Sequence, residues 1–139
     1  MAYGNRYPLP RTRNSLEEFK KYREKMNRKI LASGNLQIQR YFNLDTRAYQ
    51  NGVLSSKVKE LLGLVASLVL RCDDCITYHI IRCVEEGVSD AEFFEAFNVS
   101  LISGGSITIP HLRRAVQRLE ECRTLDRRNI SRGSAIRSR

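Results

Sequence analysis

Apolar residues along this chain recur every three or four positions, which is the spacing of helices that bury one face. Ile107–Ile109 is the only run with strand character, and three residues are too few to predict a strand. Two capping boxes, Ser15–Glu18 and Ser89–Glu92, mark helix starts, and Pro110 suits the first turn of a last helix. The pattern predicts an all-α compact bundle of five to six helices, over residues 15–32, 37–50, 55–71, 72–86, 89–103 and 110–125.

The chain of 139 residues has the length of one domain. We predict a basic leader over residues 1–14, one helical domain over 15–125 and a basic tail, rich in arginine and serine, over 126–139. The tail has too few apolar residues to fold alone, so we expect it to be flexible or to serve as an oligomer arm.

The net charge of +9 lies mainly in the two ends, because the body between them has nearly equal numbers of basic and acidic side chains. Basic ends are commonly solvated arms, so we do not expect nucleic acid as a partner. The alternative is a non-catalytic interaction module that binds a polyanion through its basic tail. Such binding would fall steeply with salt and vanish when the tail is removed.

The longest apolar run, residues 61–70, is interrupted by Gly63 and Ser67 and is shorter than the ~18 residues of a membrane span. The N-terminus also lacks the apolar segment of a secretory signal. These observations predict a cytoplasmic protein with no membrane partner. In that reducing compartment, four cysteines in a chain of this length indicate catalysis or metal binding rather than structural disulfides.

Cys72, Cys75 and His79 are spaced three and four residues apart, so a helix places all three side chains on one face. Two thiols one turn apart can close a disulfide, and the ionised thiol is the reactive species. A cysteine with the ordinary pKa of about 8.5 is mostly protonated at neutral pH, so it needs a base. His79, one turn after Cys75, can act as that general base.

The spacing leaves open which of the two thiols attacks. The positive start of a helix favours a thiolate at Cys72, whereas the nearby His79 favours one at Cys75. The negative charges of Asp73 and Asp74 oppose thiolate formation. We favour Cys75 as the nucleophile and Cys72 as its resolving partner.

Two other interpretations of the cysteine pair are a partial zinc site and two buried small side chains. A structural zinc ion has four ligands, so the fourth would have to be Glu60, Cys83 or His111. Cys83 is more simply explained as a buried, inert thiol. Cys122 has no recognisable partner spacing.

Glu60 lies on the helix expected over residues 55–71, and periodicity favours its exposure to solvent beside Lys57 and Lys59. It shares a narrow stripe with Gly63, Ser67 and Arg71. The expected core face of this helix is apolar and consists of Val58, Leu61, Leu62, Val65, Leu68 and Val69. The functional alternative is that the Glu60 carboxylate orients His79 or exchanges protons with it.

The candidate residues form one spaced pattern: Glu60, eleven intervening residues, Cys72-x-x-Cys75, three more residues and then His79. This pattern resembles the carboxymuconolactone decarboxylase superfamily, and within it the alkylhydroperoxidase AhpD-like branch. The resemblance extends over residues 54–121. Comparable features there are the Glu-Glu-Gly-Val-Ser turn at 85–89, Gly104–Gly105 and Pro110–His111.

The resemblance implies an all-helical, AhpD-like subunit that assembles into a homo-oligomer, either a trimer or a hexamer. It also implies that the two cysteines cycle between dithiol and disulfide while they reduce peroxides or pass electrons to a peroxiredoxin. The reductant would be a thiol or a protein, and no cofactor or metal is implied. Carried over to this chain, Cys75 attacks, Cys72 resolves, and Glu60 and His79 form a proton relay.

One position departs from the family pattern. AhpD has a further histidine just before its second cysteine, where this chain has Asp74, so the proton relay would be incomplete or different. The decarboxylases proper lack the cysteine pair. Their activity is therefore not expected in this chain. Lactone decarboxylation that uses Glu60 with His111 or His79 is kept as the second enzymatic hypothesis, and it predicts full activity after both cysteines are replaced.

Overall fold

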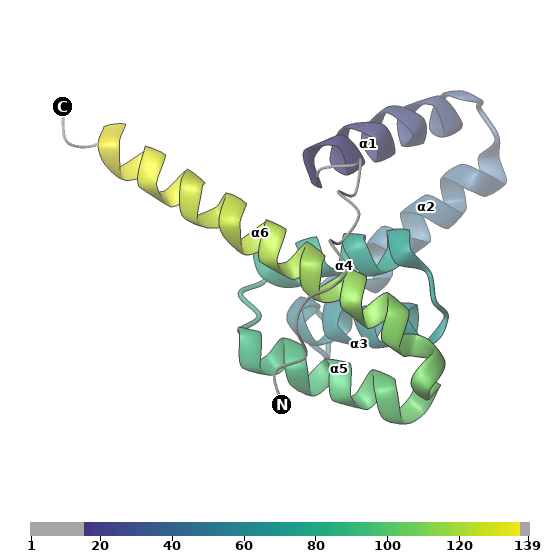
Figure 1. Cartoon of the computed structure of the whole chain (residues 1–139). Coiled ribbons are helices and arrows are strands. Elements are labelled where there is room, and N and C mark those ends of the chain that lie inside the picture. The colour runs from purple at the N-terminus through teal and green to yellow at the C-terminus, as the bar shows by residue number, and fades with distance from the viewer. Residues whose placement is uncertain (1–15, 137–139) are drawn as a thin grey trace, which may run out of the picture. The chain divides into compact units, whose positions relative to one another are not determined.

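The computed structural model describes residues 16–136, and their side chains as far as residue 129. Within that range the chain is helical and contains no strand, which confirms the all-α prediction. The elements are α1 (Leu16–Ala32), α2 (Leu36–Ala48), α3 (Ser56–Val69), α4 (Asp73–Glu85), α5 (Asp90–Gly104), the short 3₁₀ helix η1 (Ser106–Thr108) and α6 (Ile109–Ile136), as labelled in Figure 1.

The chain divides into two compact units, residues 1–40 and 41–139, with the division inside α2. In the first unit α1 is followed by Gly34 at a positive φ of 72°, and the Asn35 side chain accepts hydrogen bonds from the backbone N–H groups that open α2. The leader predicted over residues 1–14 lies outside the described residues. The domain bounds of 15–125 stay a prediction.

Local capping explains why the helices of the second unit begin and end where they do. The Ser55 hydroxyl accepts from the backbone N–H of Val58 and caps α3. Ser89 and Glu92 form the complete capping box that the sequence predicts for α5. Gly87, which follows α4, adopts a positive φ of 75°, the conformation that glycine tolerates best after a helix.

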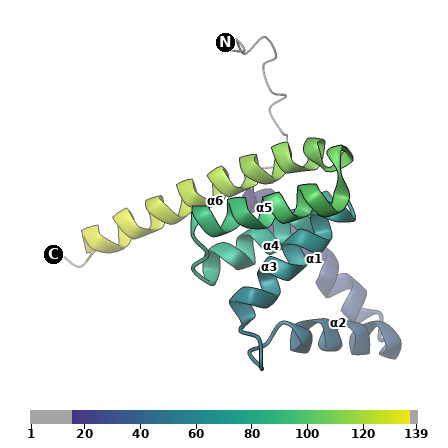
Figure 2. The ribbon, with the colours of Figure 1, turned by 90° about the horizontal axis from the view of Figure 1, so that it is seen from below.

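In the second unit α4 packs against α3 through one part of its surface and against α6 through another, while α5 also packs against α3 (Figure 1). Figure 2 views the same helices from below, with α5 and the start of α6 joined through η1. The core between them is aliphatic and aromatic, and its most deeply buried side chains are Leu64, Leu68, Ile76, Ile80, Val88, Phe93 and Phe97.

The face of α3 that points inward differs from the one expected from periodicity. Of the expected core face, Leu68 is buried, but Val58 and Leu62 are exposed, and the remaining three residues are only partly covered. The stripe with polar and small side chains is instead buried at Glu60, Gly63 and Ser67, whereas Arg71 at its end is exposed. The prediction was wrong because this stripe meets a polar partner, His79, on the neighbouring helix α4.

The last helix is longer than the sequence predicts. We expected it to end near residue 125, and α6 continues to Ile136. Arg123 extends the packed part of α6, because its guanidinium bonds the Asp90 carboxylate and the carbonyl oxygen of Val88. No proline follows Pro110 to interrupt the helix. None of the described helices combines the length and the apolar character needed to cross a membrane.

Candidate active site

The cysteine pair lies where α4 begins. Cys72 is the N-cap residue of α4, and its Sγ accepts a hydrogen bond from the backbone N–H of Cys75 at 3.3 Å. The two cysteines are joined by a disulfide, with their Cα atoms 5.2 Å apart. Cys75 is exposed and Cys72 is half-buried. An external thiol or peroxide therefore reaches Cys75 more easily, while Cys72 lies at the positive end of the helix.

The chain turns sharply just before the disulfide. Arg71 adopts a φ of 59°, in the left-handed region that non-glycine residues rarely occupy. The backbone N–H of Cys72 then bonds the carbonyl oxygen of Ser67, the residue that faces inward on α3. These contacts attach the cysteine-bearing turn to α3 and position it at the α3–α4 junction.

Glu60 and His79 form a buried carboxylate–imidazole pair between α3 and α4. The Nδ1 atom of His79 lies 2.8 Å from Oε2 of Glu60. Glu60 is 1% exposed and His79 is 8% exposed. With Nδ1–H donated to the carboxylate, Nε2 is left as the basic nitrogen of the ring. The structure thus brings Glu60 and His79 together, as the functional alternative for Glu60 requires.

The disulfide and the His79 member of the buried pair belong to the same helix, whereas Glu60 comes from α3. His79 follows Cys75 by one turn of α4, as the sequence indicates. Across residues 16–129, no hydrogen bond joins the imidazole to either sulfur in this disulfide form. The general-base role expected for His79 would require the reduced form, in which the Cys75 thiol is released from the bond.

Arg82 completes the charge balance around Glu60, and sequence reasoning did not single it out. Its Nε lies 3.4 Å from Oε1 of Glu60, and the same guanidinium bonds Glu85 and Glu86. Burial alone would lower the pKa of Arg82, but the carboxylates, Glu85 foremost, outweigh it and raise that pKa. The available signal was its spacing, because residues three apart on a helix share a face and Arg82 follows His79 by three.

Gly63 allows the imidazole to sit close to α3. A Cβ atom at this position would lie 2.5 Å from Cε1 and 2.8 Å from Nε2 of His79, and 2.8 Å from the hydroxyl of Tyr49. Any side chain here would therefore displace the ring. Burial, followed by the nearby charges of Asp45 and Glu60, raises the pKa of Tyr49, so its hydroxyl keeps its proton at neutral pH. Sequence reasoning missed Tyr49 because this residue directly follows the end of α2 and has no regular spacing in the sequence to the residues of α4.

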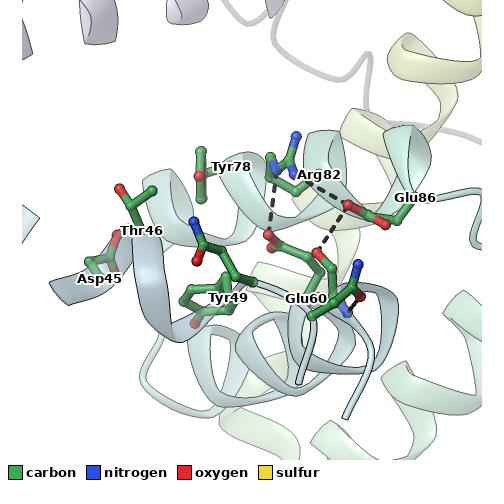
Figure 3. Close-up of a pocket in the computed structure, with 10 residues that line it drawn as sticks. Asp45, Thr46, Tyr49, Glu60, Tyr78, Arg82 and Glu86 are labelled. Atoms are coloured by element: carbon green, nitrogen blue, oxygen red, sulfur yellow. Dashed lines mark hydrogen bonds and ion pairs between the residues drawn. The ribbon is translucent and has the colours of Figure 1, made fainter. Parts of the chain in front are cut away.

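A pocket of about 630 Å³ opens beside Glu60 (Figure 3). Figure 3 shows Arg82 bridging Glu60 and Glu86, with Tyr49 and Tyr78 nearby. The lining is polar and carries more acidic than basic groups: Asp45, Thr46, Tyr49, Gln50, Asn51, Ser56, Glu60, Tyr78, Arg82 and Glu86. The pocket connects the otherwise buried Glu60 carboxylate to the outside, but the two sulfurs are not part of its lining.

The remaining cysteines, Cys83 and Cys122, are buried and lie outside the disulfide. Burial, then the charges of Glu60 and Glu86, raises the pKa of Cys83 to about 12, so this thiol stays protonated at neutral pH. This agrees with the interpretation of Cys83 as inert. Cys122 is 5% exposed on α6.

His111, the other histidine, pairs with Asp73 and not with Glu60. Its Nδ1 lies 2.7 Å from Oδ1 of Asp73. In the part of the chain that the structure describes, no group of three or more His, Cys, Asp and Glu side chains is arranged to hold a metal ion. A zinc site built on Cys72 and Cys75 therefore has no ligand set among those residues.

Comparisons with known proteins show what this chain is similar to. A family model described as the carboxymuconolactone decarboxylase family matches residues 38–118. Two crystal structures of a Thermotoga maritima protein are 55% and 54% identical to this chain, cover 81% of it and 98% and 95% of their own chains, and superpose with TM-scores of 0.79 and 0.78. The protein of the second structure is described as a member of the carboxymuconolactone decarboxylase family and as a candidate for a role in the antioxidative response.

A more distant structure shares the fold alone. It is the apo form of a carboxymuconolactone decarboxylase family protein from Legionella pneumophila, 20% identical over 77% of this chain and 96% of its own, with a TM-score of 0.71. A search of curated proteins finds no significant match to this chain.

Proposed function

Since the chain belongs to the carboxymuconolactone decarboxylase family, we propose that it is a thiol–disulfide oxidoreductase of the alkylhydroperoxidase type. Its substrate is a peroxide or the disulfide of a partner protein, and its working residues are Cys75, Cys72, His79 and Glu60. One observation carries this proposal: an exposed disulfide at the start of α4 stands one turn before a buried carboxylate–imidazole pair. The description of the Thermotoga relative as an antioxidative candidate supports the same class of chemistry.

The oxidising half-reaction uses Cys75 as the nucleophile. The Cys75 thiolate attacks one oxygen of a hydroperoxide, the O–O bond breaks, and the other oxygen leaves and takes a proton to give an alcohol. Cys75 is now a sulfenic acid. The Cys72 thiolate attacks its sulfur, the disulfide forms, and hydroxide leaves with a proton as water. The exposure of Cys75 and the position of Cys72 at the N-cap of α4 support this division of roles.

His79 and Glu60 provide the protons for these steps. In the reduced form His79 accepts the Cys75 proton, and the resulting imidazolium is stabilised by Glu60, whose carboxylate receives Nδ1–H. The same proton is returned to the leaving oxygen. The pocket beside Glu60 gives the pair its route to exchange protons with solvent. In this chain the Glu60–His79 pair acts without the further histidine that AhpD has just before its second cysteine, because Asp74 occupies that position.

A thiol or a protein dithiol returns the disulfide to its reduced form. The reductant's thiolate attacks the exposed Cys75 sulfur, and Cys72 leaves as a thiolate next to the backbone N–H of Cys75. No cofactor is needed in this cycle. The buried Cys83 thiol, which forms no disulfide, supports a cytoplasmic setting, because proteins of oxidising compartments usually pair their cysteines.

Assembly into a homo-oligomer, a trimer or a hexamer, belongs to the same proposal. Large apolar side chains that remain exposed on α3 and α5 support it: Leu62, Phe94, Val99 and Ile102. The basic tail is an arm of this assembly rather than a site for nucleic acid.

Lactone decarboxylation is less well supported as the second enzymatic hypothesis. It uses Glu60 with His111 or His79, and His111 instead bonds Asp73 on α4. The pocket beside Glu60 also carries an excess of carboxylates, which repels an anionic carboxylactone.

Counting thiols before and after a stoichiometric dose of peroxide tests the proposal. We expect the reduced wild-type protein to lose two thiols quickly and mass spectrometry to place the new bond between Cys72 and Cys75. The Cys75→Ser variant is expected to form no such bond. A wild-type pair that stays reduced, or a Cys72→Ser, Cys75→Ser double variant that retains lactone decarboxylase activity, would contradict the redox assignment.

A further inference from the structure

A second polar cluster lies beside the disulfide and has no role in the chemistry above. Asp73, the residue after Cys72, binds two side chains of α6, the helix that crosses α4 in Figure 1. Its Oδ1 lies 2.7 Å from Nδ1 of His111, and its Oδ2 lies 2.9 Å from Nε of Arg114. Nη2 of Arg114 is also 3.0 Å from Nδ1 of His111. The cluster thus ties the first turn of α4 to the first turns of α6.

Nδ1 of His111 meets a carboxylate oxygen of Asp73, which can only accept, at 2.7 Å and a guanidinium nitrogen of Arg114, which can only donate, at 3.0 Å. It cannot serve both, and the shorter contact places the imidazole proton on Nδ1, so that Arg114 bonds Asp73 and not the ring. If Nδ1 were bare, its lone pair would face the negatively charged Oδ1 of Asp73, which is unfavourable. With Nδ1 protonated, the imidazole donates to Asp73 and Arg114 donates to the second carboxylate oxygen. Both oxygens of Asp73 are then occupied by donors from α6.

This pairing changes what Asp73 does to the neighbouring thiolate. Burial alone would raise the pKa of Asp73, but hydrogen bonds from His111 and Arg114 outweigh it, and the pKa is lowered. Asp73 is therefore a carboxylate at neutral pH, and its negative charge is balanced by the arginine. Asp74, the next residue, is exposed and faces no such partner from α6 among the described contacts. Of the two carboxylates that follow Cys72, only that of Asp73 therefore has its negative charge balanced by side chains of α6 among the described contacts.

We propose that Arg114 and His111 are positioning residues of the redox centre, which hold and neutralise Asp73 so that Cys72 can leave as a thiolate. The inference rests on the proposed redox function and names the groups that tune it. These residues do not touch the substrate. They act through the charge of Asp73 on the stability of the reduced form.

The affected step is the opening of the disulfide by a dithiol reductant. A reductant thiolate attacks Cys75 Sγ, and the bond to Cys72 breaks with its electron pair leaving on Cys72 Sγ. The reductant's second thiolate then displaces Cys75 and closes the reductant's own disulfide. Two electrons and two protons have passed from the reductant to the cysteine pair. A thiolate beside an uncompensated carboxylate is a poorer leaving group, so losing Arg114 slows this step.

The test measures the ionisation of Cys72 in a Cys75→Ser background, by the ultraviolet absorbance of the thiolate as pH rises. Cys83, with a pKa of about 12, does not interfere near neutral pH. Because the Asp73–Arg114 pair is about half-exposed, we expect Arg114→Gln to lower the Cys72 ionisation constant by about threefold. Arg113→Gln is the matched control, since it removes the same charge from an exposed neighbour and is expected to change the constant less.

A double-variant comparison identifies the route of the effect. In an Asp73→Asn background, Arg114→Gln is expected to leave the ionisation constant unchanged, because the charge it compensates is gone. The inference is overturned if Arg114→Gln has no effect, or if its effect persists without Asp73. A merely structural contact would lower Tm without moving the ionisation constant. Failure of the proposed function is separate, because it shows as a wild-type pair that does not respond to peroxide.

Discussion

Two carboxylate–histidine pairs flank α4, and they are built alike but placed differently. In each, one carboxylate oxygen bonds Nδ1 of a histidine, at 2.8 Å for Glu60–His79 and 2.7 Å for Asp73–His111. In each, the other oxygen meets Nε of an arginine, at 3.4 Å for Arg82 and 2.9 Å for Arg114. The Glu60 side chain is 2% exposed, whereas that of Asp73 is 45% exposed.

This difference in burial separates what the two pairs can do. Electrostatic interactions are several times stronger inside a protein than beside water, so the buried pair can stabilise an imidazolium at the moment a proton moves. The exposed pair is screened and contributes a small, steady charge effect. In the function that we propose, the same bond at nearly the same distance is a proton relay on the α3 side and a modulator on the α6 side.

The largest expected effect concerns the sulfur atoms of Cys75 and Cys83, near the two ends of α4. The pKa of the buried Cys83 is raised to about 12, whereas Cys75 is exposed near the helix start. At pH 8 we expect Cys75 of the reduced native protein to react with an alkylating reagent at least about a thousandfold faster than Cys83. Timed alkylation followed by peptide mapping measures both rates. Comparable rates would show that burial does not make Cys83 less reactive than Cys75.

The second prediction compares two variants, in each of which the histidine of one pair is replaced by glutamine. His79→Gln is expected to slow peroxide oxidation of the cysteine pair by about a hundredfold or more, because it removes the general base. His111→Gln is expected to slow it by less than about fivefold, because its pair is half-exposed. Stopped-flow measurements on folded variants, checked by circular dichroism, provide the rates. Equal losses for the two variants would abolish the distinction drawn here.

The third prediction concerns the close packing that only the buried pair requires. Gly63→Ala places a Cβ atom 2.5 Å from the His79 ring and is expected to lower the free energy of unfolding by about 1–3 kcal/mol. Gly52→Ala is the control, since its Cβ would meet only the Lys59 amine at 3.6 Å. Urea denaturation of both variants checks the difference. If Gly63→Ala is as stable as Gly52→Ala, the imidazole is not held against α3.

The smallest effect is the pH dependence of the exposed pair. Because the pKa of Asp73 is lowered in the folded state, its contribution to stability is present above the ordinary value near 4 and is lost as pH falls below it. Its half-exposed position limits this contribution to less than about 1 kcal/mol. We expect wild type to exceed Asp73→Asn slightly in unfolding free energy at pH 6.5, with the gap shrinking below about pH 4. A gap that grows in acid would reverse the sign of the argument.

Local chemistry predicted much of this fold. The capping box at Ser89 begins α5 as expected, the helix expected from residue 55 is capped by Ser55, and Gly87 follows the end of α4. Helical spacing also placed the cysteine pair and His79 on one helix. These features depend on residues within a turn or two of each other, so one sequence is enough to find them.

The inward face of α3 could not be predicted in the same way. Periodicity assigns the apolar side to the core, yet Glu60, Gly63 and Ser67 are buried there. Glu60 is buried against His79, which lies nineteen positions away in the sequence and on another helix. The Asp73–His111 bond spans 38 positions. Such tertiary pairings leave no local signal, and a functional stripe violates the rule that apolar faces turn inward.

The central claim is that Cys72 and Cys75 form a working redox couple rather than a structural disulfide. Equilibrating the native protein in buffers of oxidised and reduced glutathione or dithiothreitol, and quantifying the pair by mass spectrometry, tests this directly. We predict one reversible two-electron transition between about −270 and −120 mV, confined to Cys72 and Cys75. A pair that remains oxidised below about −300 mV would be a structural disulfide and would contradict the account.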